Sequence, residues 1–303
     1  MAVRAHFGDL LTPGFREIFD GSFKEVPDVR SQIFATHTSD KDTEKDSSVF
    51  WFGLAQETAE GAPIDYDEPV QGYDTTYTHL KYSKGFKVSL EMYEDDLYNM
   101  MNKRPAALGR AMGRTAENQA ALVFVRAFNS SYLGADSEEL CSTSHDRADG
   151  GTAQSNASAT GVTLTEANIE TARNAMRDQL DDRGQIINVN PNLLLIPIEL
   201  EKEAHEIIDS ERRSGTADND LNFWKGRFQI VDWIYLTSAT AWFLLDTSVK
   251  QLNWFWRRQP TFKSDELFDS EYAVYKSTMR LSRGWSDWRG AWGSQGDGAA
   301  YSG

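Results

Sequence analysis

Ser144, His145 and Asp146 stand side by side in the segment STSHD, and they carry the three side-chain types of a hydrolytic triad. A triad needs a nucleophile, a base and an orienting acid that converge in space beside an oxyanion hole. Sequence neighbours do not converge in this way, and the segment lacks a nucleophile-elbow pattern. We therefore expect no catalytic role for these residues and no enzymatic turnover by the chain.

Metal and phosphate chemistry have equally little support. The histidines are dispersed, no two of them have the four-residue spacing of a helical ligand pair, and the lone Cys141 excludes an intrachain disulfide or a cysteine zinc cage. The segment GRAMGRTAENQ has glycines but no phosphate-loop pattern. No apolar run is long enough to span a membrane, and the N-terminal residues do not have the pattern of a secretory signal. We expect no metal, no cofactor and no membrane partner.

The tryptophans could serve a different chemistry. Nine are present, and Trp254, Trp256, Trp285, Trp288 and Trp292 cluster near the C-terminus. Aromatic rings on a rigid sheet can stack on sugars, but large aromatic side chains also anchor cores and protein interfaces. We favour a core or interface role, and keep a sugar-binding or sugar-cleaving protein as the alternative.

Charge is distributed unevenly along the chain. The net charge is −15, which argues against sequence-specific DNA binding. Residues 46–80 carry seven acidic side chains and no lysine or arginine, whereas residues 101–126 carry five basic side chains and one acidic. Each region is either a solvated surface or a surface that meets a partner of opposite charge.

The elements that must position these residues follow from the hydrophobic pattern. Residues 1–35 carry many large apolar side chains interrupted by prolines and glycines, which indicates an extended arm that buries its apolar side chains elsewhere. Residues 38–48 are interpreted as a charged linker. Alternation over 49–56 and 73–92 predicts the two strands of a long hairpin. The acidic cluster 94–96 then begins a helical run directly after the second strand.

Helical spacing continues to about residue 129. Because proline is best tolerated in a first turn, Pro105 predicts a short helix over 93–103 and a long one over 105–129. Its predicted buried stripe consists of Leu108, Met112, Ala116, Gln119, Val123 and Ala127.

The second half of the chain alternates between helical and strand patterns. Residues 134–162 are interpreted as a surface loop, and Thr165 is expected to cap a helix that runs to about Leu180. A buried strand over 192–197, a helix over 198–212 and further strands complete the chain. This order predicts an α+β fold.

This order of parts resembles the major capsid proteins of tailed bacteriophages with the Hong Kong 97 fold, and within them the Mu-like major head subunit group. The segments that carry the resemblance are KGFKVSLEMYEDDLYNMM before LGRAMGRTAENQAALVFVRAFN, LCSTSHD with SNA, LLLIPIELEKEAHEI, and MRLSRGWSDWRGAWGSQG. None of them is a catalytic signature, and the likeness lies in their order across nearly the whole chain.

The resemblance implies a function and a division of the chain. An N-terminal arm would span residues 1–46, an extended hairpin (the E-loop) 47–80, a peripheral domain with the spine helix 81–150 and 250–303, and an axial domain 151–249. Such subunits form hexamers and pentamers that close into an icosahedral shell around double-stranded DNA. The implied partners are other copies of the chain, portal, scaffold and decoration proteins, and the implied location is the virion, assembled in the bacterial cytoplasm. An encapsulin-like shell protein is a further alternative.

Two hypotheses about charge follow from this resemblance. The acidic hairpin would lie on basic residues of a neighbouring subunit, through the contacts Glu57, Glu60, Asp65, Asp67 and Glu68 on one side and Arg257, Arg258, Arg283 and Arg289 on the other. The basic beginning of the spine helix would face packaged DNA nonspecifically, through Lys103, Arg104, Arg110 and Arg114.

The chain departs from the family pattern in two places. Some members weld the shell through a hairpin lysine, but residues 46–80 contain none, so we expect no isopeptide crosslink there. The N-terminal residues also do not resemble the helical scaffolding extension of some members, which suggests a separate scaffold protein or earlier removal of that extension.

Overall fold

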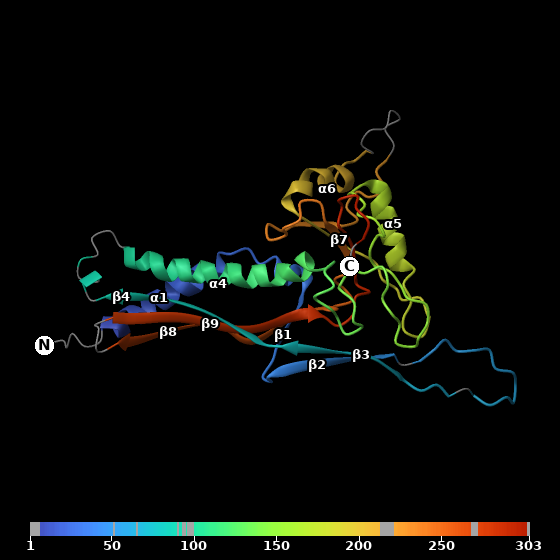
Figure 1. Cartoon of the computed structure of the whole chain (residues 1–303), viewed down its shortest axis with the longest axis horizontal. Coiled ribbons are helices and arrows are strands. Elements are labelled where there is room, and N and C mark those ends of the chain that lie inside the picture. Colours follow the sequence, from blue (N-terminus) through green and yellow to red (C-terminus); the bar gives the residue numbers. More distant parts are fainter. Residues whose placement is uncertain are drawn as a thin grey trace.

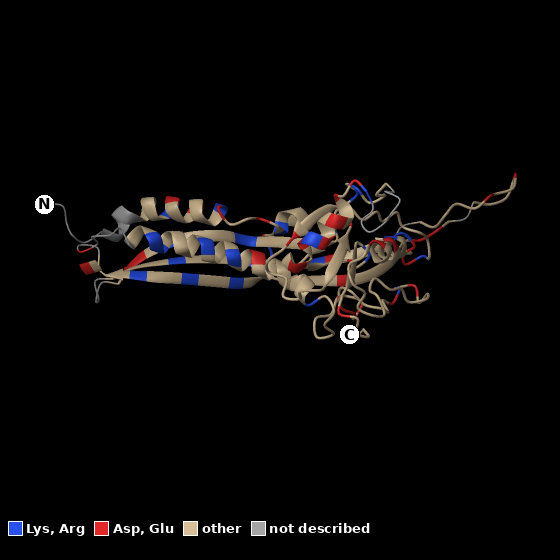
Figure 2. Cartoon of the chain, turned by 90° about the horizontal axis from the view of Figure 1, so that it is seen from above, with Lys and Arg blue, Asp and Glu red and all other residues tan. Residues whose placement is uncertain are grey.

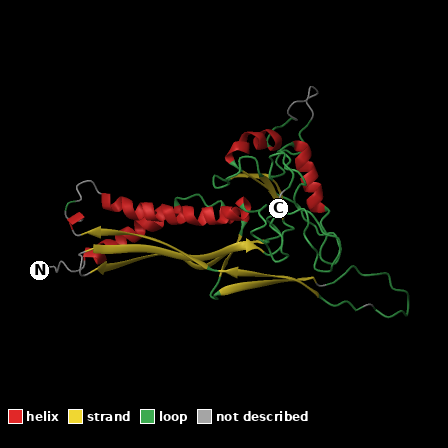
Figure 3. Cartoon of the chain, viewed as in Figure 1, coloured by secondary structure: helices red, strands yellow, loops and turns green. Residues whose placement is uncertain are grey.

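The computed structural model describes residues 7–301, except residues 51, 65, 90, 93–94, 96–99, 213–220 and 268–271. Long strands and helices form an elongated platform, which joins a compact end that contains a second sheet (Figure 1). A hairpin leaves the junction and projects past the compact end (Figure 3). The mixture of helices and strands confirms the predicted α+β class.

A four-stranded sheet forms the platform, in the order β1-β8-β9-β4. Its strands are β1 (Ala35–Thr38), β4 (Leu80–Ser89), β8 (Leu252–Leu267) and β9 (Tyr272–Trp285). β1 runs parallel to β8, and the other pairs are antiparallel. Buried and exposed residues alternate along β9, where Tyr275 is buried and Lys276 is exposed. This two-residue period turns one face of the sheet toward a core and leaves the other face open.

Helices cover the apolar face of this sheet. They are α1 (Phe7–Lys24), the short α2 (Arg30–Ile33) and the long α4 (Met100–Val125). Leu108, Met112 and Ala116 of α4 are buried, as the predicted stripe requires. Figure 1 shows α1 and α4 on the side of the sheet opposite the hairpin.

Two glycines of α4 allow α1 to approach closely. A Cβ atom added at Gly109 would lie 2.5 Å from the carbonyl oxygen of Phe19, and one added at Gly113 would lie 2.8 Å from a methyl group of Val26. Neither contact is sterically possible, so only glycine permits this separation of the two elements. The glycines of GRAMGR therefore serve helix packing.

The expectation of an extended arm is wrong for the described residues after Phe7. Residues 7–24 form α1, in which Phe15 and Phe19 are 2% and 1% exposed. Phe15 contacts Tyr275 of β9, with 5.2 Å between the ring centres, and Phe19 contacts Phe262 of β8. These apolar side chains are buried within their own chain because α1 packs against α4 and the long sheet.

Glu117 and Arg30 form a buried junction between α4 and α2. The Glu117 carboxylate accepts hydrogen bonds from the backbone N–H groups of Val29 and Arg30, each at 3.2 Å. The Arg30 guanidinium lies 4.7 Å from the ring centre of Trp254. Burial raises the pKa of Glu117 to about 7, although the Arg30 backbone N–H and guanidinium act in the opposite direction.

Two predicted boundaries near the hairpin and the spine helix are wrong. α4 continues through Pro105, which lacks an N–H group and therefore removes the backbone hydrogen bond to residue 101. The predicted linker 38–48 contains strand residues from Thr43 onward. Most of the predicted junction between strand and helix, residues 90–99, lies outside the described residues.

The compact end is built on a second sheet, in the order β10-β7-β5-β6. Its strands are β5 (Leu193–Ile196), β6 (Gln229–Asp232), β7 (Trp242–Leu245) and β10 (Ala291–Ser294), and its helical elements are α5 (Glu166–Arg177), the single-turn η2 (Ile198–Leu200) and α6 (Glu201–Ile208). The strand predicted over 192–197 is confirmed, since every residue of β5 is buried. Thr165 caps α5 as predicted, with its hydroxyl accepting from the Asn168 N–H.

β5 and β7 separate two hydrophobic cores. Leu195 and Phe243 face the core shared with α4, whereas Leu194 and Trp242 face the core beneath α5 and α6. Phe243 lies 5.2 Å from Phe124 of α4, ring centre to ring centre. The small sheet therefore fixes the compact end to the end of the spine helix.

The predicted surface loop over 134–162 is irregular, as expected, but much of it is buried. The His145 ring is fully buried and stacks on Trp288 at 4.2 Å. Its two nitrogens contact Asp136 at 2.6 Å and Asn156 at 3.0 Å, and neither contacts Ser144. The side-chain amide of Asn156 donates to the carbonyl of Ala291 in β10 at 3.1 Å. These polar contacts attach the loop to the compact end and do not assemble a triad.

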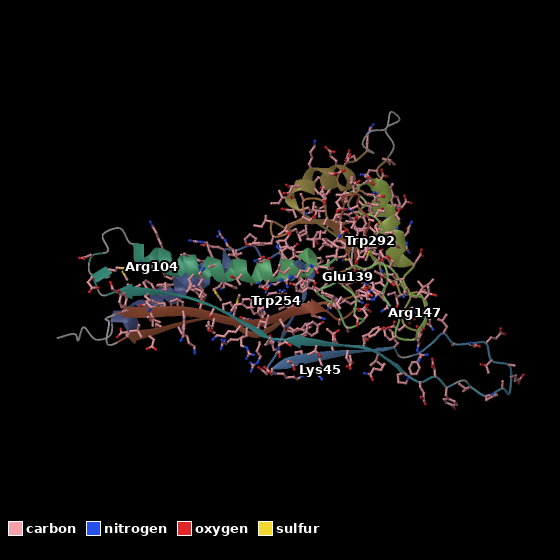
Figure 4. The ribbon with its side chains drawn as sticks, in the orientation of Figure 1. Lys45, Arg104, Glu139, Arg147, Trp254 and Trp292 are labelled. Carbon is pink, nitrogen blue, oxygen red and sulfur yellow. The ribbon has the colours of Figure 1, made fainter. Side chains whose placement is uncertain are left out.

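Four of the five tryptophans near the C-terminus are core residues, and Trp285 is half-buried. Trp254 and Trp292 are 0% and 4% exposed, and Trp256 and Trp288 are buried as well. Figure 4 shows Trp254 between α4 and the long sheet and Trp292 inside the compact end. No row of exposed indole rings exists among these residues, which removes the basis of the sugar-platform alternative.

Candidate assembly surfaces

The hairpin consists of β2 (Thr43–Phe50), β3 (Val70–Thr78) and the connecting loop over 52–69. Its strands are antiparallel, with a register shift between Ser47 and Val49. An added Cβ at Gly72 would lie 2.9 Å from the Phe50 ring, so a larger residue there would displace side chains of β2. The first strand has the predicted length but begins six residues earlier, at Thr43. The predicted second strand over 73–92 is divided between β3 of the hairpin and β4 of the long sheet.

The root of the hairpin is fixed to the open face of the long sheet. Tyr77 of β3 is 3% exposed, its ring centre lies 4.9 Å from that of Phe255, and burial raises its pKa to about 12. His79 is hydrogen-bonded to Ser39 at 3.1 Å and to Ser282 at 3.0 Å. The hairpin therefore leaves the body from a rigid base.

The loop over 52–69 exposes large apolar side chains. Phe52, Leu54, Ile64 and Tyr66 are 68%, 79%, 70% and 88% exposed. Figure 2 shows acidic residues and no basic residue along the projecting part. Exposed apolar groups gathered on one segment are typical of a protein interaction site, and the charge favours a cationic partner surface.

The structure places four of the five predicted acidic contact residues on the hairpin loop. Glu57, Glu60 and Glu68 lie exposed on the loop. Asp67 is engaged within its own chain, because its carboxylate lies 2.6 Å from the guanidinium of Arg183, and the Arg183 guanidinium lowers the pKa of Asp67. Asp65 lies outside the described residues, and its role stays a prediction.

Two of the predicted basic contacts are not on an open surface. Arg289 is 4% exposed and pairs with Asp182 at 2.8 Å and Asp287 at 3.1 Å. Arg283 is half-buried, burial lowers its pKa, and its charge interacts with Tyr82 and with Arg126 at the end of the spine helix. Tertiary packing encloses Arg289, so the prediction that it meets a neighbouring hairpin is wrong. The contact of the half-buried Arg283 stays a prediction.

The other two predicted arginines lie beside a basic surface that the sequence did not reveal. Arg258 of β8 pairs in register with Arg280 of β9, which pairs with Lys81 of β4, so three cations lie in one row. A second row joins Lys263 and Lys276. We call these five residues the cationic sheet face. Like charges directly opposite each other destabilise a sheet, unless an anion covers them.

Arg257 lies at the margin of the cationic sheet face. Its guanidinium is 3.9 Å from the carboxylate of Asp40, and its side chain is 33% exposed. Arg280 similarly lies 3.5 Å from Asp42. Acidic residues of the chain itself therefore neutralise part of this surface.

The basic residues of the spine helix lie on the other side of the platform. Lys103 and Arg114 are exposed, and Arg110 lies 3.5 Å from Glu25 of the segment after α1. Arg104 donates to the carbonyl oxygen of Lys87. The hairpin and the helix thus present acidic and basic surfaces on opposite sides of the molecule.

Other kinds of site have little support in the described part of the chain. No helix there is both long enough and apolar enough to cross a membrane. The described histidine, cysteine and acidic residues include no group of three or more that could hold a metal ion.

Comparison with known proteins defines the class. Residues 72–293 match the phage capsid protein family. The fold is also that of the capsid of bacteriophage JBD30, with a TM-score of 0.56 and 16% identity over 78% of this chain and 100% of that chain. The JBD30 capsid decorated with minor capsid protein trimers matches with a TM-score of 0.55 and 15% identity, over 78% of this chain and 96% of that chain.

A virus-like particle from Pyrococcus furiosus gives a TM-score of 0.55 at 9% identity, over 93% of this chain and 98% of that one. No curated protein sequence matches the chain. The chain belongs to the phage capsid protein family, and it is a structural protein of a phage shell with the Hong Kong 97-like fold. Its place in the Mu-like group stays a prediction.

Proposed function

We propose that the chain is the major head subunit of a tailed phage, and that it assembles as hexamers and pentamers into an icosahedral shell around double-stranded DNA. The observation that carries this proposal is the projecting loop, whose apolar side chains have no cover in their own subunit. Family membership favours this function over a sugar-binding protein or an encapsulin-like shell.

The acidic loop of one subunit docks on the cationic sheet face of a neighbour. The hairpin lies on the side of the platform opposite the helices, and so does the cationic sheet face (Figure 1). Subunits related by rotation about axes normal to a shell all turn the same side outward. The projecting hairpin of one subunit therefore lies at the same height in the shell as the cationic sheet face of its neighbour. Exposed ion pairs contribute only about 0–1 kcal/mol each. The apolar side chains of the loop, which become buried on docking, therefore supply most of the binding energy. The charges align the loop on its neighbour.

The spine helix side faces the packaged DNA. Lys103, Arg104, Arg110 and Arg114 lie on this side, away from the hairpin. Contacts of such residues with phosphates are nonspecific and weaken with salt. The direct test measures DNA retention in filled heads as salt rises, with the four residues replaced by glutamine as the comparison.

The remaining partners complete the proposal. Portal and scaffold proteins join the shell during assembly in the host cytoplasm, and a decoration protein binds the outside of the shell. The JBD30 capsid is likewise decorated with minor capsid protein trimers. The projecting loop over 52–69 contains no lysine, and Lys45 lies in β2 at the root of the hairpin. The loop therefore holds its neighbour by noncovalent contacts.

Electron microscopy of the purified protein tests the function. Rings or closed shells are expected, and small discrete oligomers under all assembly conditions would refute it. Lys81→Glu combined with Arg280→Glu should block assembly, whereas the matched change Lys202→Glu on α6, away from the cationic sheet face, should not. Normal shells from the double variant at low and high salt would refute the docking surface alone.

A further inference from the structure

The turn over 181–185, which we call the mount, is held rigid by internal hydrogen bonds and carries Arg183 next to the hairpin. The Asp181 carboxylate accepts from the backbone N–H groups of Arg183 at 2.9 Å and Gln185 at 2.8 Å. The Asp181 N–H donates to the carbonyl of Gln185 at 2.8 Å. Gly184 completes the turn with a φ of 75°, a conformation that favours glycine. Arg183 therefore leaves the backbone from a fixed position.

The same turn is anchored in the body of the subunit. Asp182 is 2% exposed, pairs with the buried Arg289 at 2.8 Å and accepts from the Ala148 N–H at 3.1 Å. Arg289 also donates to the carbonyl of Leu180 at 2.8 Å. Charged hydrogen bonds inside a protein are strong and directional, so the turn follows the compact end as one piece.

Arg183 connects this mount to both legs of the hairpin loop. Its guanidinium lies 2.6 Å from the Asp67 carboxylate and also donates to the carbonyl oxygen of Glu68 on the return leg. The same Asp67 oxygen accepts from the Gly53 N–H of the outgoing leg at 2.7 Å. Arg183 has only 15% of its side chain exposed, although it contacts a surface loop.

The close approach leaves little space at Gly53. An added Cβ would lie 3.2 Å from the Asp67 carboxylate and 3.3 Å from the side-chain amide of Gln185. The two legs and the turn therefore meet at one point, and residues 54–66 extend beyond it. We call this junction of Gly53, Asp67 and Arg183 the hairpin clamp.

We propose that Arg183 is a positioning residue, which fixes the direction in which residues 54–66 leave the subunit and thereby the angle at which one subunit holds the next. This inference rests on the proposed function and deepens it. Each leg beyond the clamp has about six residues and reaches roughly 20 Å when extended. A rotation of about 10° at the clamp moves the tip by roughly 3–4 Å, which is the length of a side-chain contact.

The test measures the direction of the loop in the dilute, unassembled full chain. Spin labels are placed on Thr58→Cys in the loop and Ala167→Cys on α5, while the native Cys141 is buried and stays unlabelled. The parent protein should give one narrow distance peak. Arg183→Ala should lose that single peak, whereas Arg183→Lys, which keeps a charged donor for Asp67, should retain more of it. The exposed Arg177→Ala is the matched control and should change nothing.

Micrographs of the same proteins without labels give the second measurement. Arg183→Ala should form shells of altered or mixed diameter. If Arg183→Ala disturbs folding by circular dichroism, Asp67→Asn weakens the clamp from the hairpin side and replaces it in both measurements. An unchanged distance peak together with shells of parental diameter overturns the clamp and leaves the proposed function intact. Absence of any shell from the parent protein overturns the proposed function itself.

Discussion

Replacement of Gly109 by alanine tests whether α1 belongs to its own subunit. The new Cβ would lie 2.5 Å from the carbonyl oxygen of Phe19, and a backbone atom has no rotamer by which to avoid it. An ordinary C···O contact is about 3.3 Å or longer. α1 must therefore move outward by about 0.8 Å or more, which opens a gap along the buried rings of Phe15 and Phe19.

The expected magnitude follows from opposing contributions. Burial of each phenylalanine ring stabilises by about 2–3 kcal/mol, and a gap of about 0.5–1 Å forfeits roughly a quarter to a half of the contact attraction. Alanine has a higher helix propensity than glycine, which stabilises the variant by at most about 1 kcal/mol. We expect Gly109→Ala to lower the free energy of unfolding by about 1 kcal/mol.

Gly21→Ala in α1 is the matched control. No atom lies within 4 Å of an added Cβ at this position. The same chemical change should therefore raise stability there, by about 0.5–1 kcal/mol. Urea unfolding of the unassembled subunit, followed by tryptophan fluorescence, measures both variants. If Gly109→Ala also shifted the unfolding midpoint upward, the packing of α1 on α4 would be refuted.

Three further outcomes are expected. Because the pKa of Glu117 is raised from 4.5 to about 7, its contribution to stability is complete below about pH 4.5 and is lost as the pH rises through 7. Between pH 5 and 8 the free energy of unfolding, measured with urea, should fall by up to about 2–3 kcal/mol more in the parent than in Glu117→Gln. An equal fall in both proteins would contradict this. Thr165→Ala should cost about 1 kcal/mol through the lost α5 cap, while the exposed Thr171→Ala should cost less; equal losses would count against the cap. Denaturing gels of assembled particles should show a single band of 34.2 kDa, and ladders of its multiples would disprove noncovalent closure.

Much of the platform could be predicted from local patterns. The alternation over 73–92 predicts strand residues, and the helical stripe with Leu108, Met112 and Ala116 predicts the buried side of α4. These predictions succeed because a half-buried strand and an amphipathic helix each impose a period on the sequence. The period does not say which element lies against which, and for this reason the arm prediction for α1 was wrong.

The candidate surfaces were only partly predictable. The acidic character of the hairpin is a local property, and Glu57, Glu60 and Glu68 are exposed as expected. The cationic sheet face was missed because Lys81, Arg258 and Arg280 come from separate strands and meet only through strand register. The sequence carried no signal for this row beyond the alternation that places each residue on one face.

The sequence by itself carried the family resemblance, through the order of its segments. Its composition and periodicity determined the α+β order of elements and the unbalanced charge, because both are local properties of the chain. Only the tertiary structure decided where individual charges lie. Arg289 is enclosed by Asp182 and Asp287, whereas Arg258 stays exposed. A guanidinium is stable in either setting, provided that it is paired when buried. Its role therefore depends on neighbours that are distant in sequence and that folding alone brings together.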